Sequence, residues 1–79
     1  MHLLKFENYN CQPCVQVSEY LKDTPYTVIN PFEEPDKGKL HKVRSLPTLI
    51  LMDGEIELDR TTGFKPKEID RLVNRIKGA

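Results

Sequence analysis

Two cysteines separated by two residues, Cys11 and Cys14, most constrain how this chain can fold. They lie between the short apolar run of residues 3–6 and a segment with helical periodicity, so they mark a strand-to-helix junction. Across the first turn of a helix, two such thiols can face each other and close or reopen a small disulfide ring. The chain has no other cysteine, and a bridge over so short a loop can stabilise a fold only slightly. The pair therefore indicates redox or metal chemistry.

Length and charge limit the classes of protein to which the chain can belong. Its 79 residues predict one domain, residues 1–79. Twelve basic and twelve acidic residues cancel, so nothing favours binding to nucleic acid or to a membrane surface. The N-terminus lacks the pattern of a signal peptide, and no segment approaches the roughly 20 apolar residues of a membrane span. We therefore expect a monomeric cytoplasmic protein.

The apolar pattern predicts an α/β fold whose elements follow the order βαβαββα. Strands are expected at residues 3–6, 26–29, 48–52 and 55–59, and helices from residue 11 to about 22, from about 35 within the segment 33–44, and from 66 to 76. The first two strands should be parallel, joined by a right-handed crossover, and Asp53-Gly54 predicts a two-residue hairpin turn between the last two. This is a four-stranded mixed sheet flanked by helices. It places the cysteines at the carboxyl end of the first strand, where open α/β sheets hold their sites.

Apolar residues at helical spacing predict the buried face of each helix. The expected contacts are Cys14, Val17, Ser18 and Leu21 in the first helix, Leu40 and Val43 in the second, and Ile69, Leu72, Val73 and Ile76 in the third.

The two cysteines differ in their expected ionisation. A free cysteine, with a pKa of about 8.5, is mostly protonated at neutral pH, but the N–H groups at a helix N-terminus favour the thiolate. Cys11 is therefore expected to attack a substrate disulfide, and Cys14, buried one turn further on, to displace the reduced substrate from the mixed disulfide. Gln12 and Pro13 should tune this balance, Pro13 by fixing the backbone and Gln12 by adding no charge.

Metal binding is the alternative chemistry. Cys11 and Cys14 with His2 and His41 would supply four ligands, all of types that zinc accepts. However, structural zinc sites usually combine one Cys-x-x-Cys with a second pair at a defined spacing, and these two histidines are single. Two cysteines that merely pack in the core are the third interpretation.

In its order of elements and in three motifs, the chain resembles the thioredoxin/glutaredoxin superfamily over nearly its whole length. The motifs are residues 11–14 (Cys-Gln-Pro-Cys), residues 43–48 (Val-Arg-Ser-Leu-Pro-Thr) and residues 63–66 (Gly-Phe-Lys-Pro). The resemblance implies a thioredoxin-like fold and a dithiol–disulfide oxidoreductase, an electron carrier that reduces protein disulfides. It also implies that Pro47 follows a cis peptide bond beside the cysteines and that the backbone of Leu46 pairs with the substrate's extended chain. Tyr9, before the first cysteine, either lines the substrate groove or simply packs.

The sequence departs from each branch of that superfamily. Asn10 stands where thioredoxins carry a tryptophan, and Lys5 falls at about the position of their buried acid. The proton acceptor for Cys14 therefore stays open, with Glu7 or water as candidates. The segments 45–47 and 62–64 differ from those with which glutaredoxins hold glutathione, so a flavoprotein reductase is the expected electron source.

The resemblance also implies the partners. Electrons are expected to come from NADPH through that reductase, with no cofactor bound to this chain. The short length and residues 63–66 resemble the redoxins that supply ribonucleotide reductase, which is therefore one candidate among disulfide-containing protein substrates. A non-catalytic thioredoxin-fold module bound to a partner protein is the alternative, and an oxidase or isomerase is a third possibility that depends on the reduction potential.

Overall fold

Seven elements follow one another along residues 1–78, the part of the chain that the computed structural model describes. They are β1 (His2–Phe6), α1 (Gln12–Tyr20), β2 (Thr27–Ile29), α2 (Pro35–Leu40), β3 (Thr48–Asp53), β4 (Ile56–Thr62) and α3 (Pro66–Lys77). The strands form one sheet in the order β2-β1-β3-β4, in which β1 and β2 are parallel and β3 is antiparallel to both of its neighbours. This confirms the predicted thioredoxin-like fold class. None of the three helices in this range is long and apolar enough to cross a bilayer.

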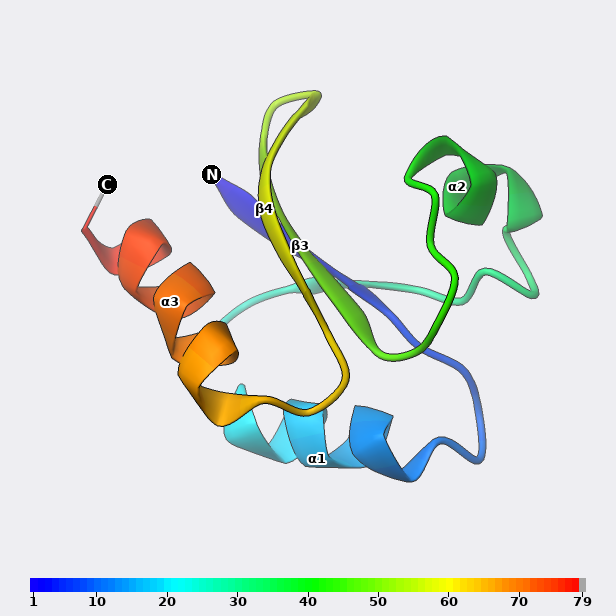
Figure 1. Cartoon of the computed structure of the whole chain (residues 1–79), viewed down its shortest axis with the longest axis horizontal. Coiled ribbons are helices and arrows are strands. Elements are labelled where there is room, and N and C mark those ends of the chain that lie inside the picture. The colour runs from blue at the N-terminus through cyan, green and yellow to red at the C-terminus, as the bar shows by residue number, and fades with distance from the viewer. Residues whose placement is uncertain (79) are drawn as a thin grey trace.

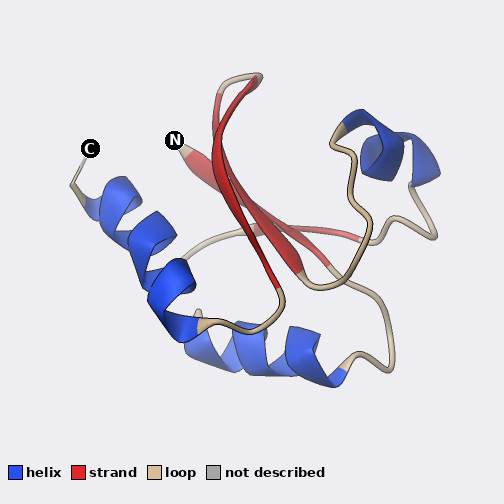
Figure 2. Ribbon diagram, in the orientation of Figure 1, coloured by secondary structure: helices blue, strands red, loops and turns tan. Residues whose placement is uncertain are grey.

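The sheet carries helices on both of its faces, with α1 and α3 on one side and α2 on the other (Figures 1 and 2). Successive side chains of a strand point to opposite faces, so β1 and β3 contribute to two cores. One core fills the space between the sheet and the helices α1 and α3, and both sides contribute to it. Its buried residues are Leu3, Val17, Leu21, Leu49, Leu51, Ile69 and Leu72. The opposite face buries Leu4, Phe6, Ile29, Ile50 and Met52. The continuous apolar runs at residues 3–6 and 48–52 are thus central strands, as expected for segments buried on both faces.

The structure corrects the prediction for α2. The expectation that Leu40 contacts the core is wrong, because this side chain is 74% exposed. The helix has only six residues, and the one that it buries is Gly38, where an added Cβ would lie 3.0 Å from the Cβ of Pro31. The helix therefore packs through its glycine against the loop before it. Val43, which follows the helix, makes the predicted core contact.

The β3–β4 hairpin is displaced by one residue from the predicted turn. Its two turn residues are Gly54 and Glu55, because Asp53 still pairs with Ile56. Gly54 has a φ of 60°, in the left-handed region that glycine adopts without a steric penalty. Strand β4 also continues past its predicted end at residue 59, because its last residues remain paired with the start of β3.

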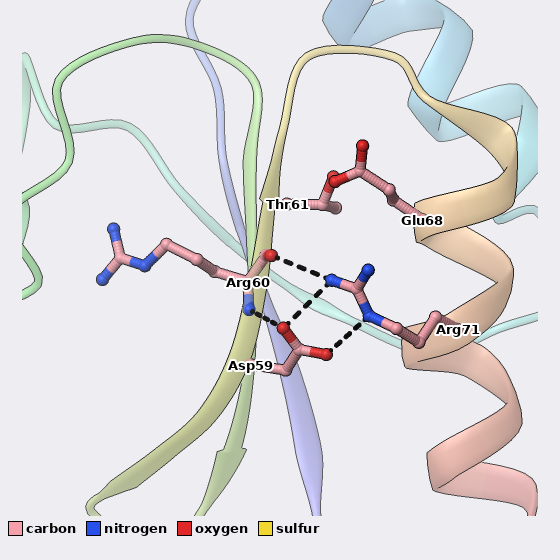
Figure 3. Close-up of polar contacts among 5 residues, drawn as sticks. All are labelled: Asp59, Arg60, Thr61, Glu68 and Arg71. Atoms are coloured by element: carbon pink, nitrogen blue, oxygen red, sulfur yellow. Dashed lines mark hydrogen bonds and ion pairs between the residues drawn. The ribbon is translucent and has the colours of Figure 1, made fainter.

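Side-chain contacts at the surface hold α3 against β4 (Figure 3). The guanidinium of Arg71 donates from Nε to Oδ2 of Asp59 at 2.8 Å and from Nη2 to Oδ1 at 3.0 Å. One turn earlier, Glu68 accepts a hydrogen bond from the hydroxyl of Thr61 at 3.0 Å. The hydrogen bond from Arg71 lowers the pKa of Asp59, so the carboxylate keeps its charge and its two bonds. The apolar side of α3 is buried as its periodicity predicted.

Candidate active site

Cys11 and Cys14 form a disulfide at the N-terminus of α1, with their Cα atoms 5.2 Å apart. Cys11 is the N-cap residue and has an extended backbone, so it stands just outside the helix. Its Sγ accepts a hydrogen bond from the backbone N–H of Cys14 at 3.3 Å. Pro13 lies in the first turn of α1. Proline has no backbone N–H, but N–H groups in the first turn of a helix have no acceptor within the helix, so no hydrogen bond is lost. The structure therefore holds the pair in its oxidised form.

The two sulfur-bearing residues differ in their access to solvent. Cys11 is partly exposed, whereas Cys14 is only 2% exposed. Cys11 is therefore the more accessible of the two residues. Its sulfur accepts a hydrogen bond from the N–H of Cys14 at the helix N-terminus, an environment that favours a thiolate over a thiol. This arrangement suits Cys11 to nucleophilic attack and Cys14 to the intramolecular step that follows.

Asparagine side chains fix the loop that leads to Cys11. Asn10 has a φ of 57°, a left-handed conformation that asparagine tolerates better than most residues do. The side chain of Asn30 donates to Oδ1 of Asn8 at 3.0 Å, and its Oδ1 accepts from the backbone N–H of Phe32 at 2.9 Å. The loop before the cysteines and the loop after β2 are thereby tied together. This backbone role of Asn10 has no counterpart among the predictions, where Asn10 is only a replacement for tryptophan.

Pro47 immediately precedes β3, at the end of the sheet where the cysteines lie. The Leu46–Pro47 peptide bond is cis, the form that the resemblance implied. The next residue, Thr48, pairs with Phe6 at the end of β1, so Pro47 lies near the loop that leads to the cysteines. Pro47 is buried, and its carbonyl accepts a hydrogen bond from the backbone N–H of Gly63 at 2.8 Å.

Leu46 borders a groove on the surface. The groove has a volume of about 170 Å³ and is lined by Pro31, Phe32, Val43, Arg44, Ser45 and Leu46. Within residues 1–78, the amide and carbonyl of Leu46 have no hydrogen-bond partner, so both are free to pair with an extended chain. Phe32, with 73% of its surface exposed, adds an apolar wall. Phe32 is not among the predicted site residues, because it lies in an irregular loop where no periodic pattern indicates the direction of its side chain.

The other predicted site residues, Tyr9, Gln12 and Pro13, do not line this groove but are exposed on the surface close to Cys11 in the chain. Tyr9 is 71% exposed, so the alternative that it merely packs is wrong. Its hydroxyl donates to Oε2 of Glu33 at 3.0 Å. This hydrogen bond and the negative charge of Glu33 raise the pKa of Tyr9, so the phenol remains protonated.

A buried lysine lies against α1, at the position where the resemblance points to an acid. Lys5 is 0% exposed, and its ammonium donates to the carboxylate of Glu7 and to the hydroxyl of Ser18. Its Nζ is also 5.3 Å from the centroid of the Tyr26 ring. Ser18 follows Cys14 by one helical turn. These contacts were not predicted, although the position of Lys5 inside an apolar strand indicates that its side chain is buried.

The two histidines considered as zinc ligands lie apart from the cysteines. His2 and His41 line a separate groove to which neither cysteine contributes. The ring of His41 packs edge-on against Phe6, with ring centroids 5.6 Å apart. Within the described range 1–78, no three side chains of Cys, His, Asp or Glu are grouped so that they can hold a metal ion. The structure gives the zinc alternative no support.

The sheet order, the cis-proline and the disulfide at a helix N-terminus together define a thioredoxin-fold protein with a dithiol site. The sequence matches no established family profile. It is nevertheless 35% identical over 80 residues to the SPbeta prophage-derived thioredoxin-like protein YosR of Bacillus subtilis strain 168, a match that covers 98% of this chain and 100% of that protein. The chain therefore belongs to the thioredoxin-like proteins.

Solved structures agree with this assignment. Thioredoxin 1 of Thermosipho africanus superposes with a TM-score of 0.75 at 25% identity, covering 99% of this chain and 96% of that one. The germline-specific thioredoxin Deadhead of Drosophila melanogaster has a TM-score of 0.84 at 18% identity, covering 94% and 78% of the two chains, and shows the shared fold alone. Together, the Cys11–Cys14 disulfide and these relatives support a redox function of the thioredoxin type.

Proposed function

We propose that this protein is a dithiol–disulfide oxidoreductase that reduces disulfides in other proteins through Cys11 and Cys14. One observation carries the proposal: Cys11 is a partly exposed N-cap residue whose sulfur is bonded to a buried cysteine one turn into the same helix. The sulfur of Cys11 is therefore accessible to a substrate. The thiol of Cys14 is buried, but it lies close enough to bond to the sulfur of Cys11.

The reaction consists of two thiol–disulfide exchanges. The thiolate of Cys11 attacks one sulfur of a substrate disulfide, forms a mixed disulfide and releases the other substrate sulfur as a thiolate that takes up a proton. Cys14 then loses its proton and attacks the sulfur of Cys11. A bond forms between the two cysteines, the bond to the substrate breaks, and the second substrate sulfur leaves with the electron pair and takes up a proton. The substrate is reduced by two electrons and the cysteine pair is oxidised by two, which yields the disulfide seen here.

The groove beside the cis-proline is the proposed substrate-binding edge. The unpaired amide and carbonyl of Leu46 can form backbone hydrogen bonds with an extended substrate segment, with Pro47 setting their position. Tyr9, Gln12 and Pro13 are exposed and close to Cys11 in the chain, and we propose that they also contact the substrate. Backbone hydrogen bonds do not depend on the side chains of the substrate, so this mode of binding suits several protein substrates. A ribonucleotide reductase is one candidate.

The oxidised pair must be reduced again for turnover. We propose that a flavoprotein reductase supplies the electrons from NADPH by the same exchange chemistry, and that the protein works as a cytoplasmic monomer. Turnover with thioredoxin reductase and NADPH, compared with turnover supported by glutathione, tests this part. Faster turnover with glutathione would contradict it.

Reduction of insulin disulfides by dithiothreitol tests the catalytic proposal directly. The wild-type protein should accelerate precipitation of the insulin B chain, and the Cys11→Ser variant should give only the uncatalysed rate. The matched Cys14→Ser variant, reduced and then freed of dithiothreitol, should still attack insulin but accumulate as a mixed disulfide, which mass spectrometry detects. If Cys11→Ser retains wild-type activity, the proposal is wrong. If neither wild type nor variants accelerate the reaction, the protein is better explained as a non-catalytic binding module.

A further inference from the structure

The charge of Lys5 is not explained by packing. Its side chain is 0% exposed, on the face of the sheet where Leu3 and Leu49 belong to the apolar core beneath α1. Burying an ammonium group is costly even when it is paired, and an apolar side chain of similar length would fill the same volume without that cost. The side chain of its partner Glu7 is 30% exposed, so water already solvates that carboxylate. Glu7 therefore does not require a buried lysine as its counter-ion. The position therefore requires another reason for a positive charge.

The hydrogen bond to Ser18 places this charge near Cys14. Cys14 and Ser18 are four residues apart on the inward side of α1, and residues at this spacing have Cβ atoms about 5–6 Å apart. The Nζ atom of Lys5 donates a hydrogen bond to the Ser18 hydroxyl, so the ammonium lies about one helical turn from the buried cysteine. The titratable groups that face Lys5 are Glu7, which follows its own strand, and Tyr26, which precedes β2. From β3 and α3, this face receives apolar side chains.

We propose that the Lys5 ammonium stabilises the thiolate of Cys14 and thereby accelerates the step in which Cys14 displaces the reduced substrate from Cys11. The inference rests on the proposed function. It assigns the activation of Cys14 to a buried cation, whereas the family resemblance points to a buried acid at this position. Lys5 takes no proton from Cys14. It lowers the free energy of the anion that forms when the proton leaves, while the Glu7 carboxylate offsets part of this effect.

A chromogenic disulfide separates the two exchange steps. With 5,5′-dithiobis(2-nitrobenzoate), the attack of Cys11 on the reagent releases one thionitrobenzoate and leaves a second one bound to Cys11 as a mixed disulfide. The attack of Cys14 on Cys11 then releases the second. Stopped-flow absorbance gives a rate constant for each release as a function of pH. The first release reports on the proposed function and the second on the role of Lys5, so failure of one is distinguishable from failure of the other.

Lys5→Met keeps an unbranched side chain of similar length, one atom shorter, and removes its charge. An opposite charge at close range lowers the pKa of an ionisable group by about 1–3 units, and the partial offset by Glu7 favours the lower end, so the pH midpoint of the second release should rise by about one unit. The rate of that release at neutral pH should fall by about threefold, because the tenfold loss of thiolate is partly compensated by the greater nucleophilicity of a more basic sulfur. Lys5→Arg should restore the midpoint. The first release should change little.

Glu7→Gln tests the direction of the effect. If Lys5 acts through its charge, removing the opposing carboxylate should lower the pH midpoint of the second release and increase its rate at neutral pH. If Glu7 is instead the proton acceptor for Cys14, the same variant should slow the second release. A slower second release in Glu7→Gln would therefore overturn the proposal.

Two further variants complete the design. Lys67→Met removes an exposed lysine at the start of α3 and should leave both releases unchanged. Ser18→Ala removes the hydrogen bond that places the ammonium and retains the charge, so it should raise the midpoint by less than Lys5→Met does. If Lys5→Met does not fold, the opposite shifts expected for Ser18→Ala and Glu7→Gln still decide the question. An unchanged midpoint in a folded Lys5→Met variant refutes the inference.

Discussion

The anchoring of α1 by Leu21 gives a quantitative test of how the cysteine pair is supported. Leu21 is 1% exposed and packs in the core cluster beneath α1 and α3. Truncating a buried leucine to alanine costs roughly 2–5 kcal/mol, because apolar contacts are lost and a cavity remains. A chain of 79 residues has a total stability of roughly 4–12 kcal/mol at the usual 0.05–0.15 kcal/mol per residue. Leu21→Ala should therefore remove roughly a sixth or more of the free energy of unfolding, and nearly half of it at the middle of both ranges.

Leu40→Ala is the matched control, because it makes the same chemical change at a leucine that is 74% exposed. It should alter the free energy of unfolding by no more than about 0.5 kcal/mol. Urea denaturation of both variants, followed by circular dichroism in the oxidised state, measures the two values. In a domain of this size, each 1 kcal/mol lost lowers the melting temperature by about 4–8 °C, so thermal unfolding gives an independent check. Equal costs for Leu21→Ala and Leu40→Ala would refute this account of the core.

Two further predictions concern charged contacts at the surface. Arg71→Met removes both hydrogen bonds to Asp59 and should lower the urea midpoint at neutral pH. Because folding lowers the pKa of Asp59, the stability that this carboxylate contributes is present above its ordinary pKa of about 3.9 and is lost as the pH falls through the lowered pKa of the folded protein, so the difference between wild type and variant should shrink with increasing acidity. A difference that stays constant from neutral to acidic pH would contradict this linkage. Glu33→Gln should lower the pKa of Tyr9 toward its ordinary value by removing the carboxylate that holds its proton, and an unchanged ultraviolet titration of tyrosinate would contradict the contact.

The elements that the sequence predicted well are those whose pattern has one physical explanation. The apolar run from Thr48 to Met52 is short and enclosed by turn signals, which favours a strand buried on both faces, and the repeat from Ile69 to Ile76 fits a helix with one buried side. The start of α1 at or beside Cys11 was predicted in the same way, because Pro13 favours a first turn, and the structure adds that Cys11 is the N-cap residue. In each case, local geometry and burial favour the same structure.

The errors occurred where a tertiary contact determined the outcome. Leu40 was expected in the core from its hydrophobicity, but the close contact of Gly38 with Pro31 turns α2 so that its glycine is buried. The burial of Lys5 with its charge was missed because the partner hydroxyl of Ser18 lies thirteen residues away, on another element. Neither contact is encoded in a local pattern, so a reading of periodicity along one segment cannot reveal it.

The rate of alkylation of Cys11 as a function of pH tests the central claim most directly. In the Cys14→Ser variant, Cys11 is the only thiol, and the backbone N–H of residue 14 remains in place to bind its sulfur. The account predicts that iodoacetamide reacts with a pH midpoint clearly below the ordinary cysteine pKa of about 8.5, and that the midpoint returns to that value in urea, where the helix is unfolded. The same midpoint in the folded and unfolded protein would contradict the claim that the start of α1 activates this sulfur.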